Sequence, residues 1–164
     1  MRIAARTSSA EETREVGEAL ASLLRPRDAV VLMGELGAGK TTFAQGVARG
    51  LGIEQQVSSP TFTLIKEYSG ILDLAHVDVY RLDRMQDVVD LGLDELGAGD
   101  DVLLVEWGDT IEELLPEERL RVELLTDEAA GEHIRVISIS TAGAGWVERS
   151  AELEVVMLPW AVDA

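Results

Sequence analysis

A glycine-rich stretch in the first third of the chain, GELGAGKTT at residues 34–42, carries residue types suited to phosphate chemistry. The fixed positions of the pattern GxxxxGK[ST] are filled by Gly34, Gly39, Lys40 and Thr41. Glycines let backbone N–H groups turn inward around phosphate oxygens, and a helix that begins there adds the positive end of its dipole. The stretch therefore predicts a phosphate-binding loop.

The side chains at the end of this loop extend the prediction to a nucleotide and a metal ion. The Lys40 ammonium group can reach the β- and γ-phosphates of a nucleoside triphosphate, and the Thr41 hydroxyl can ligate the accompanying Mg²⁺. The predicted nucleotide site also includes the other residues of the stretch: Glu35, Leu36, Gly37, Ala38 and Thr42.

The segments on either side of the loop have the patterns that such a site requires. Ala29–Met33 is a continuous apolar run, which is typical of a fully buried strand. After the loop, Phe43, Val47 and Leu51 recur every four residues, as in a helix. The alternative interpretation is an ordinary glycine turn between a strand and a helix, which the full motif in this context disfavours.

Two carboxylates further along the chain are candidates for the metal and for the attacking water. Glu106 ends the apolar run 102–105, the pattern of a buried parallel strand that delivers an acidic side chain beside the loop. Asp78, in the strand-like segment 72–82, is the alternative metal-side carboxylate, and the two could divide the work. Trp107 either belongs to the core or shapes the site. His76 is interpreted as a hydrogen-bonded structural residue, since no second histidine or cysteine cluster accompanies it.

A polar loop held by Pro60 precedes an alternating, strand-like segment. It lies about twenty residues beyond Lys40, where switch loops of nucleotide-binding proteins often carry a threonine toward the γ-phosphate. Thr61 is the candidate for that contact; the alternative is that Thr61 only opens the strand.

The composition of the chain limits which classes of function are possible. The chain has 164 residues, no cysteine, and a net charge of -17 from 31 acidic and 14 basic residues. A field of that sign repels nucleic acid, so we expect no strong direct binding of RNA or DNA without a basic partner. No apolar run is long enough for a membrane span, and the lack of cysteine suits a reducing compartment. We therefore expect a cytoplasmic protein with no membrane association.

The remaining patterns predict an α/β fold of a single domain. Ser9 and Glu12 form a capping box ahead of a helix, and residues 83–96 and 110–115 also have helical patterns. Alternation at 120–124 and 134–139 predicts an antiparallel pair. We expect a P-loop NTPase domain at residues 1–142, with a mostly parallel central sheet flanked by helices and an antiparallel hairpin at one edge. Residues 143–164 are expected to form a C-terminal appendage.

In order and spacing, the stretches GELGAGKTT, SSPTFTLIKEY, HVDVYRL and VEWGD make the chain resemble the bacterial TsaE family, also called YjeE. The likeness covers roughly residues 8–140, and the four stretches together are far more specific than the phosphate loop alone. It implies a small cytoplasmic ATPase that uses ATP and Mg²⁺ and supports threonylcarbamoyladenosine modification of tRNA at adenosine 37. The implied partner is the complex of TsaD and TsaB.

The resemblance also assigns roles to residues. It implies that Lys40 binds phosphates and that Thr41 and Glu106 hold Mg²⁺. It further implies that turnover requires Thr42, Asp78 and Trp107, and that Thr61 belongs to a mobile switch loop. The tail after Gly143 departs from the family pattern, and no role is carried over to it.

Other nucleotide-dependent functions compete with this interpretation. The [NT]KxD signature of guanine recognition is absent from the chain, which favours ATP. A small P-loop kinase would need an arginine-rich lid over two substrates, whereas the arginines here are scattered. A nucleotide-sensing interaction module, in which binding and not hydrolysis matters, is the third alternative.

Overall fold

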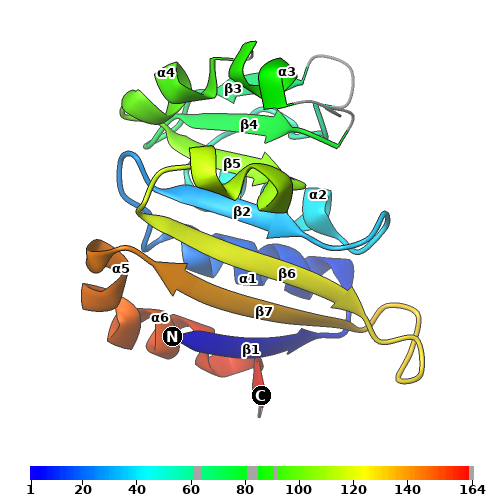
Figure 1. Cartoon of the computed structure of the whole chain (residues 1–164). Helices are drawn as coiled ribbons and strands as arrows, with labels where there is room; N and C mark the ends of the chain where they lie inside the picture. The colour runs from blue at the N-terminus through cyan, green and yellow to red at the C-terminus, as the bar shows by residue number, and fades with distance from the viewer. Residues whose placement is uncertain (61–63, 81–84, 91, 163–164) are drawn as a thin grey trace.

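In the computed structural model, residues 1–60, 64–80, 85–90 and 92–162 are described. Within them, eight strands form one sheet in the order β3-β4-β5-β2-β6-β7-β1-β8. Helices cover parts of both faces of this sheet (Figure 1). The result is a single α/β domain, as the sequence predicts.

Three parallel strands form the part of the sheet that carries the site. They are β2 (Ala29–Met33), β4 (Leu74–Asp78) and β5 (Val102–Glu106), and β5 lies between the other two. Their apolar side chains divide between two hydrophobic clusters, one on each face of the sheet. Burial on both faces explains the nearly continuous apolar runs. The predicted strands at 29–33 and 102–106 are therefore confirmed.

The sheet as a whole is mixed rather than mostly parallel as expected, because every pairing outside these three strands is antiparallel except that of β6 with β2. The hairpin of β6 (Arg119–Thr126) and β7 (Arg135–Ala142) forms as predicted, but it lies inside the sheet. On one side β6 pairs in parallel with β2; on the other, β7 pairs with β1 (Arg2–Thr7). The two edges are β8 (Ala161–Val162) and β3 (Ile65–Tyr68), which pairs antiparallel with β4.

The alternation in β6 explains this arrangement. Leu120, Val122 and Leu124 are fully buried, while Arg119 and Arg121, which alternate with them, stay partly exposed. A strand with one apolar and one polar face suits an antiparallel sheet that is covered on one side only. The hairpin thus extends the sheet beyond β2 without needing helices on both faces.

Four helices cover one face of the sheet: α1 (Ala10–Ala21), α2 (Lys40–Gly50), α5 (Ala144–Glu148) and α6 (Ser150–Met157). Helices α1 and α2 lie behind the sheet in Figure 1. Ser9 caps α1 by accepting a hydrogen bond from the Glu12 backbone N–H. The Glu12 carboxylate, however, accepts from Ser8 rather than closing the predicted box with Ser9.

The other face is covered in part by shorter helices. The single helix expected over 83–96 is instead two, α3 (Met85–Asp90) and α4 (Leu93–Ala98). Gly92 lies between them with a φ of 71°, a left-handed conformation that ends a helix. The 3-10 helix η1 (Gly108–Leu114) matches the helix predicted at 110–115 and is followed by Pro116.

The described part of the C-terminal segment joins the same sheet and core. Trp146, Leu153 and Met157 are fully buried in the same hydrophobic cluster as residues of α1 and β1, and η2 (Leu158–Trp160) leads into β8. Arg149 is also buried; its guanidinium group binds the Asp28 carboxylate with two nitrogens and lies over the Trp146 ring. Among the described residues, no helix has the length and apolar content that crossing a membrane requires.

Candidate functional site

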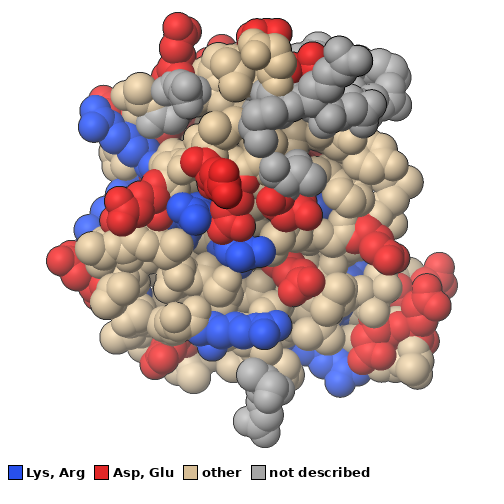
Figure 2. Space-filling view, viewed as in Figure 1, with Lys and Arg blue, Asp and Glu red and all other residues tan. Residues whose placement is uncertain are grey.

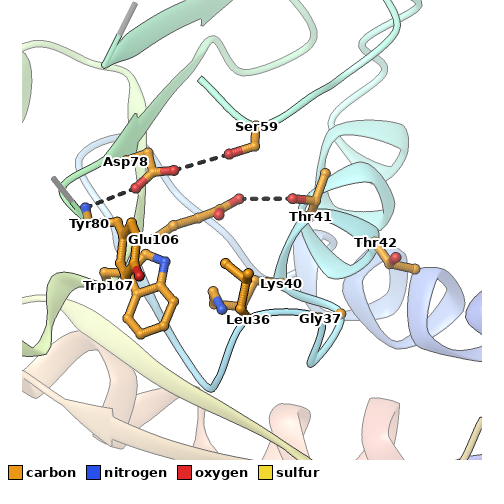
Figure 3. A pocket seen from close by; sticks show the side chains of 11 residues that line it. Leu36, Gly37, Lys40, Thr41, Thr42, Ser59, Asp78, Tyr80, Glu106 and Trp107 are labelled. Atoms are coloured by element: carbon orange, nitrogen blue, oxygen red, sulfur yellow. Dashed lines mark hydrogen bonds between the residues drawn. The ribbon is translucent and has the colours of Figure 1, made fainter. Parts of the chain in front are cut away.

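A cavity of about 480 Å³ lies where the carboxyl ends of β2, β4 and β5 meet the start of α2. In an α/β sheet, this end of parallel strands is the usual position of a ligand site. The lining residues come from the loop after β2, the first turn of α2, the loop before β3 and the ends of β4 and β5 (Figure 3). They are Leu36, Gly37, Gly39, Lys40, Thr41, Thr42, Ser59, Asp78, Tyr80, Glu106 and Trp107.

The glycines of the loop have conformations that explain their presence. Gly39, the residue before α2, has a φ of 105°, which residues with a side chain rarely adopt. Gly34 has a φ of 139° and lies so close to β6 that a Cβ atom would collide with the Leu124 carbonyl oxygen. The loop therefore turns back tightly from β2, and α2 begins with its backbone N–H groups at the cavity.

Lys40 is buried at the first turn of α2, with its ammonium group held inside the loop. Its Nζ donates hydrogen bonds to the carbonyl oxygens of Gly34 at 2.7 Å and Glu35 at 2.9 Å. It also lies 4.1 Å from the centre of the Trp107 ring. Burial lowers the pKa of Lys40 from the ordinary lysine value, and the carboxylates of Glu106 and Asp78 oppose this shift.

Glu106, at the end of β5, is 3% exposed and faces the start of α2. Its Oε1 lies 2.9 Å from Nε2 of His76 and 3.5 Å from the Thr41 hydroxyl oxygen. A hydroxyl group and a carboxylate oxygen therefore face each other beside the phosphate loop. Both are hard oxygen ligands of the kind that Mg²⁺ prefers.

Asp78 lies next to Glu106 in the register of β4 and β5. Its two carboxylate oxygens are both engaged, because Oδ1 accepts from the Tyr80 backbone N–H at 2.9 Å and Oδ2 from the Ser59 hydroxyl at 3.1 Å. The two carboxylates thus differ: Asp78 is tied to the polar loop before β3 and to the turn after β4, whereas Glu106 faces Thr41.

Trp107 follows Glu106 with a φ of 64°, which is costly for a residue with a large side chain. Its ring contacts that of Tyr80, with centroids 4.7 Å apart, and both rings line the cavity. The indole therefore forms part of the wall beside the Lys40 ammonium group. The sequence left open whether Trp107 belongs to the core or shapes the site; its side chain does line the site.

A second, smaller cavity of about 110 Å³ adjoins the first on the side of α1. Gly37, Gly39 and Thr42 line both cavities, which makes the two spaces neighbours across the loop. The residues that line only the second cavity are Ser9, Ala10, Thr13, His133 and Arg135.

Arg135 braces the phosphate loop from β7. Its Nε donates to the Ala38 carbonyl oxygen at 2.9 Å, and a terminal nitrogen lies 3.4 Å from the Gly37 carbonyl oxygen. The C=O and N–H groups of one peptide unit point in opposite directions. A fixed Ala38 carbonyl therefore directs the Gly39 N–H away from Arg135.

Most of the predicted site residues converge on this site. Three predicted residues of the loop, Gly34, Glu35 and Ala38, do not line the main cavity. Gly34 and Glu35 instead accept hydrogen bonds from Lys40 through their carbonyl oxygens, and the Ala38 side chain is buried. Thr61 lies outside the described residues. Sequence reasoning did not place Ser59 and Tyr80 at the site, and it gave His76 only a structural role. The available signal was that Ser59 lies within the stretch SSPTF, and that His76 and Tyr80 lie within HVDVY.

Comparison with known proteins gives the family. The family model described as "Threonylcarbamoyl adenosine biosynthesis protein TsaE" matches residues 7–134. A Bacillus subtilis protein named tRNA threonylcarbamoyladenosine biosynthesis protein TsaE is 48% identical over 139 residues, covering 84% of this chain and 85% of its own. The Treponema pallidum protein of the same name is 44% identical over 116 residues, covering 71% of this chain and 86% of its own.

A solved structure matches the fold over nearly the whole length. The crystal structure of YdiB from Bacillus subtilis superposes with a TM-score of 0.79 at 42% sequence identity, covering 94% of this chain and 95% of that one. The family match includes the phosphate loop, both strand-end carboxylates and the β6–β7 hairpin loop. The chain therefore belongs to the TsaE family.

Proposed function

We propose that this protein is a P-loop ATPase that uses Mg²⁺ and supports threonylcarbamoyladenosine modification of tRNA at adenosine 37 by acting on the TsaD–TsaB complex. The observation that carries the proposal is the convergence of Lys40, Thr41 and Glu106 at one cavity behind a glycine loop. The names of the relatives supply the connection to tRNA modification.

The site offers the chemistry that a triphosphate needs. Backbone N–H groups at the start of α2 and the Lys40 ammonium group supply donors for phosphate oxygens. Lys40 now donates to two carbonyl oxygens of its own loop, and a phosphate would replace these weaker acceptors. In our proposal the nucleoside lies toward the second cavity, because Gly37, Gly39 and Thr42 border both spaces.

The residues present also fit a magnesium ion. Among the described residues, no three His, Cys, Asp or Glu side chains gather into a metal-binding cluster. Mg²⁺ that accompanies a nucleotide needs only one or two protein ligands, because phosphates and waters complete its shell. Thr41 and Glu106 are those ligands in our proposal. When bound, the ion neutralises charge on the phosphate oxygens.

The chain's own groups can then orient water for hydrolysis. Water attacks the γ-phosphorus, the bond from that phosphorus to the β–γ bridging oxygen breaks, and the proton of the water leaves for a nearby base and then solvent. Glu106 is the better candidate to place the water, since both oxygens of Asp78 already accept hydrogen bonds. Asp78, with Ser59, connects this end of the site to the preceding loop.

Charge supports action through protein partners. The chain has a net charge of -17, and basic and acidic side chains lie interspersed on the face drawn in Figure 2. On the sheet, Arg119 and Arg121 share the carboxylate of Glu112, and Arg6 pairs with Asp127. These pairs reduce the attraction that the arginines would exert on RNA. We therefore propose that tRNA is held by the partners.

The test is phosphate release from ATP by the purified protein, alone and with TsaD–TsaB, together with mass spectrometry of the modified nucleoside in tRNA. We expect slow hydrolysis alone, faster hydrolysis with the complex, and modified tRNA only when ATP and Mg²⁺ are present. Transfer of the γ-phosphate to a small molecule instead of water would favour a kinase. Stimulation of modification by a non-hydrolysable ATP analogue over many turnovers would favour a sensing module.

Removal of the Arg135 brace should weaken ATP binding. In Arg135→Ala we expect about a tenfold loss of ATP affinity. A hydrogen bond from a charged donor contributes about 1.5–3 kcal/mol, and part of this free energy keeps the loop in the conformation that binds phosphate. Isothermal titration calorimetry measures the change. Arg6→Ala is the matched control, because Arg6 pairs with Asp127 in the loop of the same β6–β7 hairpin and, within the described part of the chain, makes no hydrogen bond to the phosphate loop. Equal affinity in both variants would contradict the role of Arg135.

Alkaline pH should weaken ATP binding earlier than the ordinary lysine value suggests. Burial lowers the pKa of Lys40 below the ordinary value of 10.5, so the ammonium group of the free protein loses its proton at a lower pH. Bound phosphates favour the charged form of the group. Binding then takes up a proton, and affinity falls as pH rises through the lowered pKa. Calorimetry in buffers of different ionisation enthalpy measures this uptake. Lys40→Ala should remove the proton uptake in that pH range.

A further inference from the structure

His76 is a buried histidine whose hydrogen bond within the described part of the chain is to Glu106, a residue of the site. It lies on β4, where its partner in the register of β5 is Leu104, two residues before Glu106. The ring is 0% exposed and lines neither of the two cavities described above. An imidazole in this position cannot contact a ligand in either cavity directly.

The contact between the two side chains defines which ring nitrogen carries a proton. Nε2 of His76 lies 2.9 Å from Oε1 of Glu106. An ionised carboxylate only accepts hydrogen bonds, so Nε2 is the donor. Nδ1 is buried and has no hydrogen-bond partner within the described part of the chain. The surroundings therefore suit the tautomer with its proton on Nε2, because a donor at Nδ1 would be left unsatisfied.

This contact also distinguishes the two oxygens of Glu106. Within the described residues, the hydrogen bonds to the carboxylate come from His76 and Thr41, and both reach Oε1. None of the hydrogen bonds among the described residues reaches Oε2, and Glu106 lines the main cavity. With Oε1 held by the imidazole, the carboxylate cannot rotate freely toward the Lys40 ammonium group.

We propose that His76 is a positioning residue that holds Oε1 of Glu106 so that Oε2 is presented to the cavity. The inference rests on the proposed ATP hydrolysis and deepens it. A carboxylate that orients water or a metal ion must be held within a fraction of an ångström of its working position, and a neighbouring hydrogen bond is the means. Nothing in the family pattern read from the sequence assigns this task to the histidine.

Two substitutions separate positioning from ring packing. In His76→Gln the side-chain amide reaches about as far as Nε2 and can donate to Glu106, whereas in His76→Asn it is one methylene shorter and cannot. We expect kcat to fall about 10- to 100-fold in His76→Asn, with little change in KM, because lost partners of site ligands typically cost this much. His76→Gln should recover kcat to within a few-fold of the unchanged protein. ATP affinity measured in EDTA should match the unchanged protein in both variants.

Several results would overturn the proposal. Unchanged kcat in His76→Asn would show that Glu106 needs no support from the ring. Equal losses in both variants would show that the ring acts by packing alone. Nuclear magnetic resonance of the unchanged protein provides a test independent of folding in the variants. Long-range ¹H–¹⁵N spectra should show His76 protonated on Nε2, and protonation on Nδ1 alone would refute the hydrogen bond to Glu106.

The same measurements separate this inference from the proposed function. If the unchanged protein neither binds nor hydrolyses ATP, the proposed function fails, and the positioning of Glu106 for hydrolysis fails with it. The spectra would still report whether the hydrogen bond between His76 Nε2 and Glu106 Oε1 exists. If the unchanged protein hydrolyses ATP and the two variants do not differ, only the role of His76 fails.

Discussion

In Lys40→Ala, ATP binding is expected to weaken by about 100-fold or more, because a buried charge-assisted contact to a phosphate contributes up to about 3 kcal/mol. The ammonium group lies inside the loop, where burial and the low local dielectric strengthen its attraction to an anion. Calorimetric titration with ATP and Mg²⁺ measures the loss. The thermal transition of the free protein should change much less, since within the described residues the Lys40 ammonium group donates to carbonyl oxygens of its own loop and otherwise contacts the Trp107 ring.

Lys66→Ala is the matched control for Lys40→Ala. Lys66 is the other lysine of the chain, and its ammonium group donates to Ser58 on the surface. The control should retain ATP affinity within about twofold, as expected for a surface substitution. If Lys40→Ala bound ATP as tightly as this control, the phosphate-binding role of the loop would have to be abandoned.

Glu106→Gln should nearly abolish turnover while leaving ATP bound. Replacing the carboxylate with an amide of the same shape removes the charge that we propose orients water and binds Mg²⁺, and losses of about 10²–10⁴-fold are typical for such groups. Single-turnover phosphate release measures the rate, and titration with ATP measures affinity. We expect the affinity to stay within a small factor, because the glycine loop and Lys40 still hold the phosphates.

The control for Glu106→Gln is the same change at an exposed glutamate. Glu67→Gln, on the edge strand β3, removes one negative charge without touching the cavity. Equal hydrolysis by both variants would exclude Glu106 as the group that places the water and would direct attention to Asp78. A loss of binding in Glu106→Gln would instead point to a structural role for the carboxylate.

Much of the site was predictable because its parts are local in the chain. The glycine loop, Lys40 and Thr41 lie within a few residues of one another, and their spacing alone specifies a phosphate cradle. The runs that end at Met33 and Glu106 are apolar throughout, so burial on both faces of a parallel sheet could be inferred from them. The carboxyl ends of such strands meet at one edge, which is why Glu106 and Asp78 were expected beside the loop.

The arrangement of the outer strands was harder to predict. The segments 2–7 and 161–162, which form β1 and β8, are short and only partly apolar. Their place in the sheet is set by the pairing of β1 with β7 and of β8 with β1. Strand propensity depends on such neighbours more than on the residues themselves. The hairpin of β6 and β7 was therefore recognised, but its position inside the sheet was not.

By itself, the sequence determined the residue types at the end of β2: which residues are suited to bind a phosphate, which hydroxyl follows them, and which strands carry acidic ends. Only the tertiary structure decided that His76 contacts Glu106 and that Arg135 donates to the phosphate loop. It also decided that the Asp78 carboxylate accepts hydrogen bonds from the Ser59 hydroxyl and the Tyr80 backbone N–H. The first set depends on short spacings along one chain segment. The second depends on strand order and register, which bring together side chains that are far apart in sequence and that no local pattern pairs.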